Sequence, residues 1–240
     1  MRILALESSA LAASVALVED GTLKAQNMQQ AGLTHSKTLL PMIHALFTTL
    51  GQTLDDVDKI AVAIGPGSFT GIRIGLSTAK GLAWAKDKPL AGVSTLEAMA
   101  HQAKHLSPGI ICPVMDARRN QVYNALFAYK EDKLIRLTED RAIAIEALFS
   151  EPDFHENYIL VGDGAALCHA YLRAQGRNTQ ILPEHLVQQT AWGVAMAALE
   201  LPGESAHSVS PNYIRPSQAE RERLEKMGDC STPLKKGESS

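Results

Sequence analysis

Short apolar runs separated by turn residues predict the strands of the N-terminal half. Ile3 to Leu6, Ser14 to Val18 and Leu23 to Met28 have extended patterns, and Asp20-Gly21 favours a hairpin between the last two. Lys59 to Ile64 is a β-branched, almost wholly apolar run. Such runs are typical of strands that are buried on both faces of a parallel sheet.

Helical periodicity follows two of these strands. The first predicted helix ends at Gly51, and Thr34 or Ser36 can cap its start. A second helix is expected over residues 70–85, and a third from Leu96 to His105. Strands and helices therefore alternate along this half of the chain.

The second half repeats this alternation more loosely. Strands are expected at residues 110–115, 122–129, 134–138 and 158–161, and helices at 143–149, 165–175 and 190–201. The pattern predicts an α/β fold with two lobes and mixed sheets. Ser107-Pro108-Gly109 marks the best boundary. We expect an N-terminal lobe at 1–106, a C-terminal lobe at 107–216, and a charged arm with a disordered tail at 217–240.

The segment GPGSFTG, residues 65–71, looks like a phosphate-binding loop. Its glycines follow an apolar strand and precede a helix, where backbone N–H groups can approach an anion. A Walker loop would continue with Lys and Ser or Thr, but Ile72 and Arg73 follow Gly71. A dinucleotide fingerprint would need glycine where Thr70 stands. Neither named phosphate motif is present.

The helix after this loop carries a stripe of small residues. Gly71, Gly75, Ala79 and Ala83 are spaced by four and share one helix face. Each helical glycine costs about 0.5–1 kcal/mol relative to alanine, so a close packing contact must offset it. The spacing alone favours close packing inside the chain's own core over a docking face for another protein.

Composition excludes several classes of protein. The chain has 240 residues and a formal net charge of −3, so no overall basic field draws it to nucleic acid or to a membrane surface. Cys112, Cys168 and Cys230 form no C-x-x-C pair, which favours reduced thiols. No apolar run has membrane length, and the N-terminal run is too short for a signal peptide. We expect a cytoplasmic protein.

Several longer motifs together resemble the TsaB (YeaZ) family of bacterial tRNA-modification proteins. The most specific is GPGSFTGIRIGLSTAKGLA at 65–83, and HSKTLLPMI at 35–43 supports it. Further support comes from ILALESS near the N-terminus, GVSTLEAMA at 92–100, DARRNQVY at 116–123, VGDGA at 161–165 and SPNYIRPSQAE at 210–220. The resemblance covers most of the chain.

The resemblance implies a fold and a role. The fold is the two-lobed ASKHA architecture (actin, Hsp70 and sugar kinases; ribonuclease H-like). The role is that of a non-catalytic subunit that binds and activates TsaD, which transfers threonylcarbamoyl to the adenosine beside the tRNA anticodon. The ATPase TsaE joins the complex, the chain forms a homodimer when TsaD is absent, and tRNA is contacted only through the complex.

The resemblance also reverses the interpretation of the glycine stripe. In this family the helix after His-Ser and the helix after GPGSFTG form a bundle with TsaD, so docking becomes the leading hypothesis. The expected interface residues are His35, Leu39, Ile43, Gly71, Gly75, Leu76, Ala79 and Ala83.

A nucleotide site is the weaker expectation. The family usually opens with Ile-Asp-Thr, and this chain has Glu7 at the aspartate position, which weakens metal–nucleotide catalysis by this lobe. No resident cofactor is expected, only weak ATP or ADP binding at the partner interface. The candidate phosphate contacts are Glu7, Gly67, Ser68 and Asp163. A stand-alone ASKHA kinase or ATPase remains the alternative function.

Other motifs have plainer explanations. His101 and His105 have the spacing of helical metal ligands, but the apolar side of their helix turns both toward solvent, so no metal site or metallo-endopeptidase is expected. The loop from Asp116 to Asn120 is most simply a polar hairpin, with a tRNA or TsaE contact as the alternative. Trp84 is most simply a core anchor and otherwise an interface hot spot.

Overall fold

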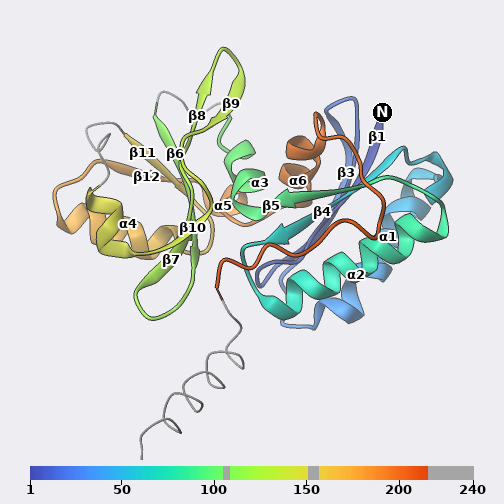
Figure 1. Cartoon of the computed structure of the whole chain (residues 1–240), viewed down its shortest axis with the longest axis horizontal. Helices are drawn as coiled ribbons and strands as arrows, with labels where there is room; N and C mark the ends of the chain where they lie inside the picture. Colours follow the sequence, from blue (N-terminus) through green and yellow to red (C-terminus); the bar gives the residue numbers. More distant parts are fainter. Residues whose placement is uncertain (105–108, 151–156, 216–240) are drawn as a thin grey trace, which may run out of the picture.

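Two α/β lobes lie side by side in the computed structural model, which describes residues 1–104, 109–150 and 157–215 (Figure 1). The N-terminal lobe contains one five-stranded sheet with the order β3-β2-β1-β4-β5. Its strands are β1 (Arg2–Glu7), β2 (Ala13–Glu19), β3 (Thr22–Gln29), β4 (Lys59–Gly65) and β5 (Leu90–Ser94). β1, β4 and β5 run parallel, and β2 and β3 form the expected antiparallel hairpin.

Helices cover both faces of this sheet. α1 (His35–Leu50) and α2 (Phe69–Ala85) pack against each other and on one face, and α6 (Ala191–Ala198) packs on the other. Successive side chains of β1 point to opposite faces of the sheet, and those from Ile3 to Leu6 are all apolar, so both faces need a cover. Leu4 and Leu6 face α1 and α2, while Ile3 and Ala5 face α6. A short 3₁₀ turn, η1 (Leu54–Asp56), precedes β4.

The C-terminal lobe contains a seven-stranded mixed sheet. The order β10-β7-β6-β11-β12 forms its path, β8 pairs with β6, and β9 pairs with β8. Its elements are β6 (Ile110–Asp116), β7 (Gln121–Asn124), β8 (Phe127–Lys130), β9 (Lys133–Arg136), β10 (Arg141–Ala144), η2 (Ile145–Ser150), β11 (Tyr158–Val161), α4 (Ala165–Ala174), β12 (Thr179–Ile181) and α5 (Glu184–Val187).

α3 (Thr95–His101) joins the two lobes. Its buried side packs with β6 and β8 of the C-terminal lobe, and it also contacts α6. Arg136 of β9 donates to Glu97 of α3 at 2.8 Å, and Ser94 donates to Asp140 at 2.6 Å. One group of polar contacts between the lobes therefore lies around this helix.

The two-lobed α/β organisation with mixed sheets is confirmed, but the predicted lobe boundaries need correction. α6 and the segment that follows it lie on the N-terminal sheet, although both fall inside the predicted C-terminal range 107–216. The reason is that the apolar face of α6 covers the side of β1 and β2 that α1 and α2 leave open. The boundary at 106/107 and the predicted tail at 217–240 lie outside the described residues.

Helix and strand positions were predicted best where buried residues recur with the helical or strand period. α1 ends at the left-handed Gly51 as expected, and Thr34 is its N-cap residue, although it makes no side-chain capping bond. The expected single strand at 122–129 is instead β7 and β8, interrupted at Ala125 and Leu126. Within the described residues, no helix is both long and apolar enough to cross a membrane.

Candidate functional site

The glycine segment packs against the turn that follows β1. The Ser8 hydroxyl donates to the Gly71 carbonyl at 2.9 Å. A Cβ on Gly71 would overlap the Ser8 carbonyl oxygen, and one on Gly75 would overlap the Ser8 hydroxyl. Gly67 has a φ of 153°, and a Cβ there would overlap the carbonyl oxygen of Ser9. These three glycines let α2 approach its own chain closely.

This packing uses groups that a phosphate loop would leave open. The Ser68 N–H donates to the Ser9 carbonyl at 2.7 Å, and the Ser68 hydroxyl accepts from the Gly71 N–H at 3.2 Å as the cap of α2. The arrangement of Gly67 and Ser68 therefore does not fit a nucleotide phosphate at this loop, because the β1–β2 turn takes the place that the phosphate would need.

Glu7 lies at the end of β1 and is completely buried. Its Oε1 accepts from the Ser9 N–H at 2.5 Å, whereas its Oε2 has no hydrogen-bond partner among the described residues. Burial raises the pKa of Glu7 to about 7, although the hydrogen bonds from Ser9 partly oppose this. The carboxyl group is thus substantially protonated near neutral pH.

Asp163 lies just before the start of α4, and its negative charge also contributes to the raised pKa of Glu7. It accepts a 3.4 Å hydrogen bond from Gln189, and a backbone contact from Asp116 also favours its charged form. Desolvation is nevertheless larger and raises the pKa of Asp163, even though its side chain reaches solvent. Within the described residues, no three His, Cys, Asp or Glu side chains gather to hold a metal ion.

The predicted interface residues mostly face inward, which corrects our interpretation of them as the contact surface. The stripe lies against β1 and β4, so the chain's own core fills the space that the small residues leave. Seven of the eight residues are buried: Leu39, Ile43, Gly71, Gly75, Leu76, Ala79 and Ala83. His35 is half-buried at the start of α1, and one of its ring nitrogens lies 2.8 Å from the Ala10 carbonyl.

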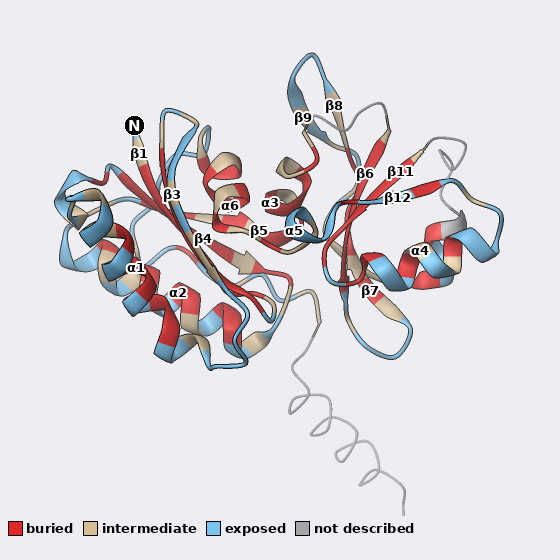
Figure 2. Cartoon of the chain, turned by 180° about the vertical axis from the view of Figure 1, so that it is seen from behind, coloured by how far each residue is buried: buried red, intermediate tan, exposed pale blue. Residues whose placement is uncertain are grey.

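The opposite sides of the same two helices are exposed (Figure 2). The exposed positions are Ser36, Lys37, Leu40, Pro41, His44, Ala45, Thr48 and Thr49 on α1, and Thr70, Arg73, Ser77, Gly81, Trp84 and Ala85 on α2. Neither helix contains Asp or Glu, although the chain has 26 of these residues in 240. Depletion of charge is typical of surfaces that become buried in an interface.

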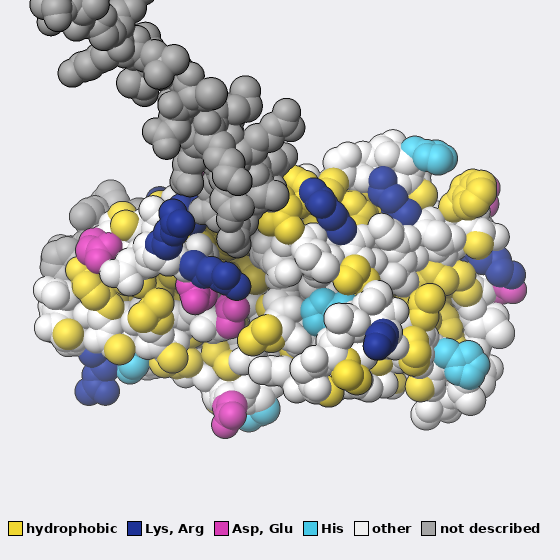
Figure 3. Space-filling view, turned by 90° about the horizontal axis from the view of Figure 1, so that it is seen from below, with side chains coloured by type: hydrophobic (Ala, Val, Ile, Leu, Met, Phe, Trp, Pro, Cys, Tyr) yellow, Lys and Arg dark blue, Asp and Glu magenta, His cyan; other side chains and the backbone are white. Residues whose placement is uncertain are grey.

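We call this surface the outer face of α1 and α2. Leu40 is 53% exposed, and Trp84 is 77% exposed, so Trp84 is not the core anchor that the sequence favoured. A Cβ on Gly81 would meet no described residue within 4 Å, so no contact within the described part of the chain explains this helical glycine. Figure 3 shows hydrophobic and histidine side chains spread over the lobe that carries these helices.

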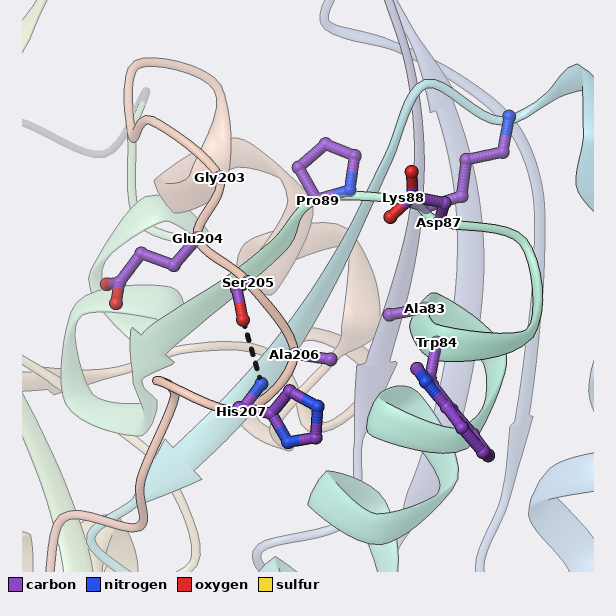
Figure 4. A pocket seen from close by; sticks show the side chains of 10 residues that line it. All are labelled: Ala83, Trp84, Asp87, Lys88, Pro89, Gly203, Glu204, Ser205, Ala206 and His207. Carbon is purple, nitrogen blue, oxygen red and sulfur yellow. Dashed lines mark hydrogen bonds between the residues drawn. The ribbon is translucent and has the colours of Figure 1, made fainter.

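A hollow of about 500 Å³ adjoins Trp84 (Figure 4). The indole and the His207 ring stand on opposite sides of it, with Ala83 and Ala206 between them. The His207 N–H donates to the Ser205 hydroxyl at 3.2 Å, which shapes the loop on that side. The hollow extends the exposed surface at the end of α2.

The remaining histidine prediction is partly wrong. His101 does not turn fully toward solvent: its Nδ1 lies 3.3 Å from the Tyr129 hydroxyl, and burial lowers its pKa to about 4. The reason is that β8 and β9 cover this end of α3. His105 lies outside the described residues.

Comparisons with known proteins agree with this architecture. Residues 28–221 match the family model described as TsaD, tRNA N6-adenosine threonylcarbamoyltransferase. The tRNA threonylcarbamoyladenosine biosynthesis protein TsaB of Bacillus subtilis (strain 168) is 32% identical over 230 residues, which cover 94% of this chain and 99% of the relative. The chain belongs to the TsaB family. It therefore has a role in tRNA threonylcarbamoyladenosine biosynthesis.

Further TsaB relatives and solved structures support the same assignment. TsaB of Escherichia coli (strain K12) is 36% identical over 167 residues, covering 68% of this chain and 72% of the relative. YeaZ from Pseudomonas aeruginosa is 25% identical with a TM-score of 0.74, covering 88% of this chain and 100% of that structure. A second solved protein, titled as similar to peptidase YEAZ, gives a TM-score of 0.77 at 26% identity, covering 89% and 99%. The expected ASKHA-type fold is confirmed.

The sequence pattern selected residues on the buried faces of α1 and α2 and missed the residues on their exposed faces. Leu40 and Gly81 are off the stripe, and Ser8 is far from α2 in sequence. The absence of acidic residues from both helices was visible in the sequence and could have directed attention to their outer face.

Proposed function

We propose that this chain is a non-catalytic subunit that docks on TsaD through the outer face of α1 and α2 and activates it. The observation that carries the proposal is a paired, exposed helical surface without carboxylates, in a chain of the TsaB family. Gly81 leaves room for a partner backbone, and Leu40 and Trp84 offer apolar contact area.

Activation by docking needs preferential binding. The chain must bind the competent state of TsaD more tightly than other states, because a ligand shifts an equilibrium only by its differential affinity. TsaE joining this complex, a homodimer through the same outer face when TsaD is absent, and tRNA contact only through the complex are part of the proposal. So is a cytoplasmic location.

The alternative of a stand-alone kinase or ATPase receives less support. The Ser68 N–H donates to the Ser9 carbonyl, and Gly67 packs closely against the same carbonyl, so the loop is not open to a phosphate. Buried Glu7 is substantially protonated at neutral pH, so it is a poor ligand for a metal ion. We retain only weak ATP or ADP binding at the partner interface, formed together with TsaD.

The test is purification of the full chain alone and together with TsaD. We expect a stable complex by size-exclusion chromatography and no ATP turnover by the isolated chain. Turnover by the isolated chain that Glu7→Gln abolishes would support the kinase hypothesis instead, and failure to form a complex would remove the docking proposal.

A further inference from the structure

Residues 203–215, which we call the strap, run along the edge of the N-terminal sheet after α6. Glu204 and Leu90 exchange two backbone hydrogen bonds of 2.9 Å, so the strap begins as a short antiparallel addition to β5. Val209 is 4% exposed and packs against Gly92. A Cβ added to Gly92 would lie only 2.8 Å from the Val209 side chain. The first part of the strap is thus fixed to β5.

The strap then crosses the glycine segment. The Asn212 N–H donates to the Ile64 carbonyl at 2.8 Å, and a Cβ on Gly65 would come within 2.5 Å of the Asn212 carbonyl oxygen. Gly65 has a φ of 120°, a backbone conformation that side chains rarely adopt. The glycine at this position therefore permits the close passage of the strap.

Next the strap reaches the first turns of α2. The Tyr213 ring stacks on Phe69, with the ring centroids 4.3 Å apart and the planes 16° from parallel. Arg73 Nε donates to the Tyr213 hydroxyl at 2.8 Å, and the guanidinium carbon lies 5.5 Å from the centre of the Tyr213 ring. Because Arg73 is exposed on the outer face of α2, this side chain connects that face to the strap.

The end of the strap crosses to the C-terminal lobe. Arg215 donates to the Ala117 carbonyl at 3.2 Å and also to the Gln121 side chain. Ala117 lies in the β6–β7 turn and Gln121 is the first residue of β7. The bond from the Ala117 N–H to the Gln121 carbonyl closes this turn, and Arg118 within it has a left-handed backbone. Figure 1 shows the strap passing below β4 and ending beside β7, while α3 lies above.

The two lobes are thus joined at two separate places. Around α3, covalent connection combines with the Arg136–Glu97 and Ser94–Asp140 bonds. The second place is the side of the molecule that carries the glycine segment, residues 65–71, which we call the glycine side. Among the described residues, the cross-lobe hydrogen bonds there come from one side chain, Arg215, and reach the β6–β7 turn just after Asp116 and the first residue of β7.

We propose that the strap is a latch. Arg215 holds the lobes together on the glycine side, the contacts around α3 act as the hinge, and the Arg73–Tyr213 bond couples the outer face of α2 to the latch. A partner that draws Arg73 away from Tyr213 would weaken the hold on the β6–β7 turn. The latch itself is a property of the free chain and does not depend on the proposed function.

Distance measurement by pulsed electron resonance tests the latch on the full chain. Spin labels are placed at exposed sites in β3 and α4, away from the outer face of α1 and α2, with Thr22→Cys and Ala170→Cys. Cys230→Ser removes an unwanted site, while Cys112 and Cys168 are fully buried and stay unlabelled. We expect a narrow distribution for this background and a clearly broadened or shifted one after Arg215→Ala.

The control is Arg119→Gln, which removes an exposed guanidinium from the same turn and should leave the distribution unchanged. Gln121→Ala removes the side-chain acceptor instead of the donor and should also broaden the distribution. It keeps the latch testable if Arg215→Ala does not fold. Superimposable distributions for both latch variants and the control would overturn the latch. An unchanged distribution in Tyr213→Phe, which retains the stacked ring but loses the hydroxyl, would overturn its coupling to α2.

Discussion

The hydroxyl of Ser8 donates a 2.9 Å hydrogen bond to the carbonyl of Gly71, joining the end of β1 to the first turn of α2 across 63 positions of sequence. Gly75 continues the same contact one turn later. The glycine segment therefore seats α2 on the chain's own sheet, and the opposite side of that helix is exposed.

Substitution of Gly75 should destabilise the fold. A Cβ there would overlap the Ser8 hydroxyl, so we expect Gly75→Ala to cost about 1–3 kcal/mol, the usual effect of overpacking. Gly81→Ala is the matched control in the same helix, and it should be neutral or stabilise by about 0.5–1 kcal/mol because no residue that the structure describes comes within 4 Å of the added Cβ. Urea unfolding measures both. Equal effects would contradict the assignment of the two glycines to different sides of α2.

Replacement of Glu7 should change the pH dependence of stability. Its pKa is about 7 in the folded chain against an ordinary 4.5, so the folded state holds the proton more tightly. Stability should therefore fall as pH rises from about 4.5 to 7 and then level off, and this difference corresponds to about 3 kcal/mol.

Glu7→Gln should remove this fall, because a neutral amide carries no charge to bury. The free energy of unfolding, measured between pH 4.5 and 8, should then favour the variant most at the upper end. A variant that tracks the wild type across this range would show that Glu7 does not carry the effect.

Lys59, at the start of β4, holds the end of α6 on the sheet face opposite α1 and α2. Its Nζ donates to the carbonyls of Ala198 at 2.7 Å and Leu201 at 2.8 Å, and its side chain is nearly buried. Lys59→Met should remove the charged donor from both carbonyls, although Ala198 still accepts from the Leu201 N–H at 3.3 Å, and should reduce stability by about 2–3 kcal/mol. Lys86→Met, which removes an exposed ion pair with Asp55, should have a much smaller effect in the same thermal and urea measurements.

The sequence predicted most elements of the N-terminal lobe, since burial there follows the helical and strand periods. It did not predict the break between β7 and β8 at Ala125 and Leu126. β6 pairs with β7 near Val114 and with β8 at Ile111, and such long-range pairing leaves no local pattern. For the same reason α6 was placed in the wrong lobe.

The candidate site could be predicted only in part. Spacing showed that Gly71 and Gly75 need a close neighbour, but it could not show that the neighbour is Ser8 and not a partner helix. Family resemblance directed the interpretation to α1 and α2, but the residues it selected there face the chain's own core. Gly81 and Leu40 became informative only when burial was known.

Docking of TsaD on the outer face of α1 and α2, as proposed above, is tested most directly by calorimetric titration of the chain against TsaD. The variants are Leu40→Asp on the outer face and Leu137→Asp as the control. Both leucines are exposed, at 53% and 42%, but Leu137 lies in the C-terminal lobe. We predict that Leu40→Asp weakens binding at least about tenfold, about 1.4 kcal/mol, while Leu137→Asp binds like the wild type. Unaltered affinity of folded Leu40→Asp would contradict docking at this face.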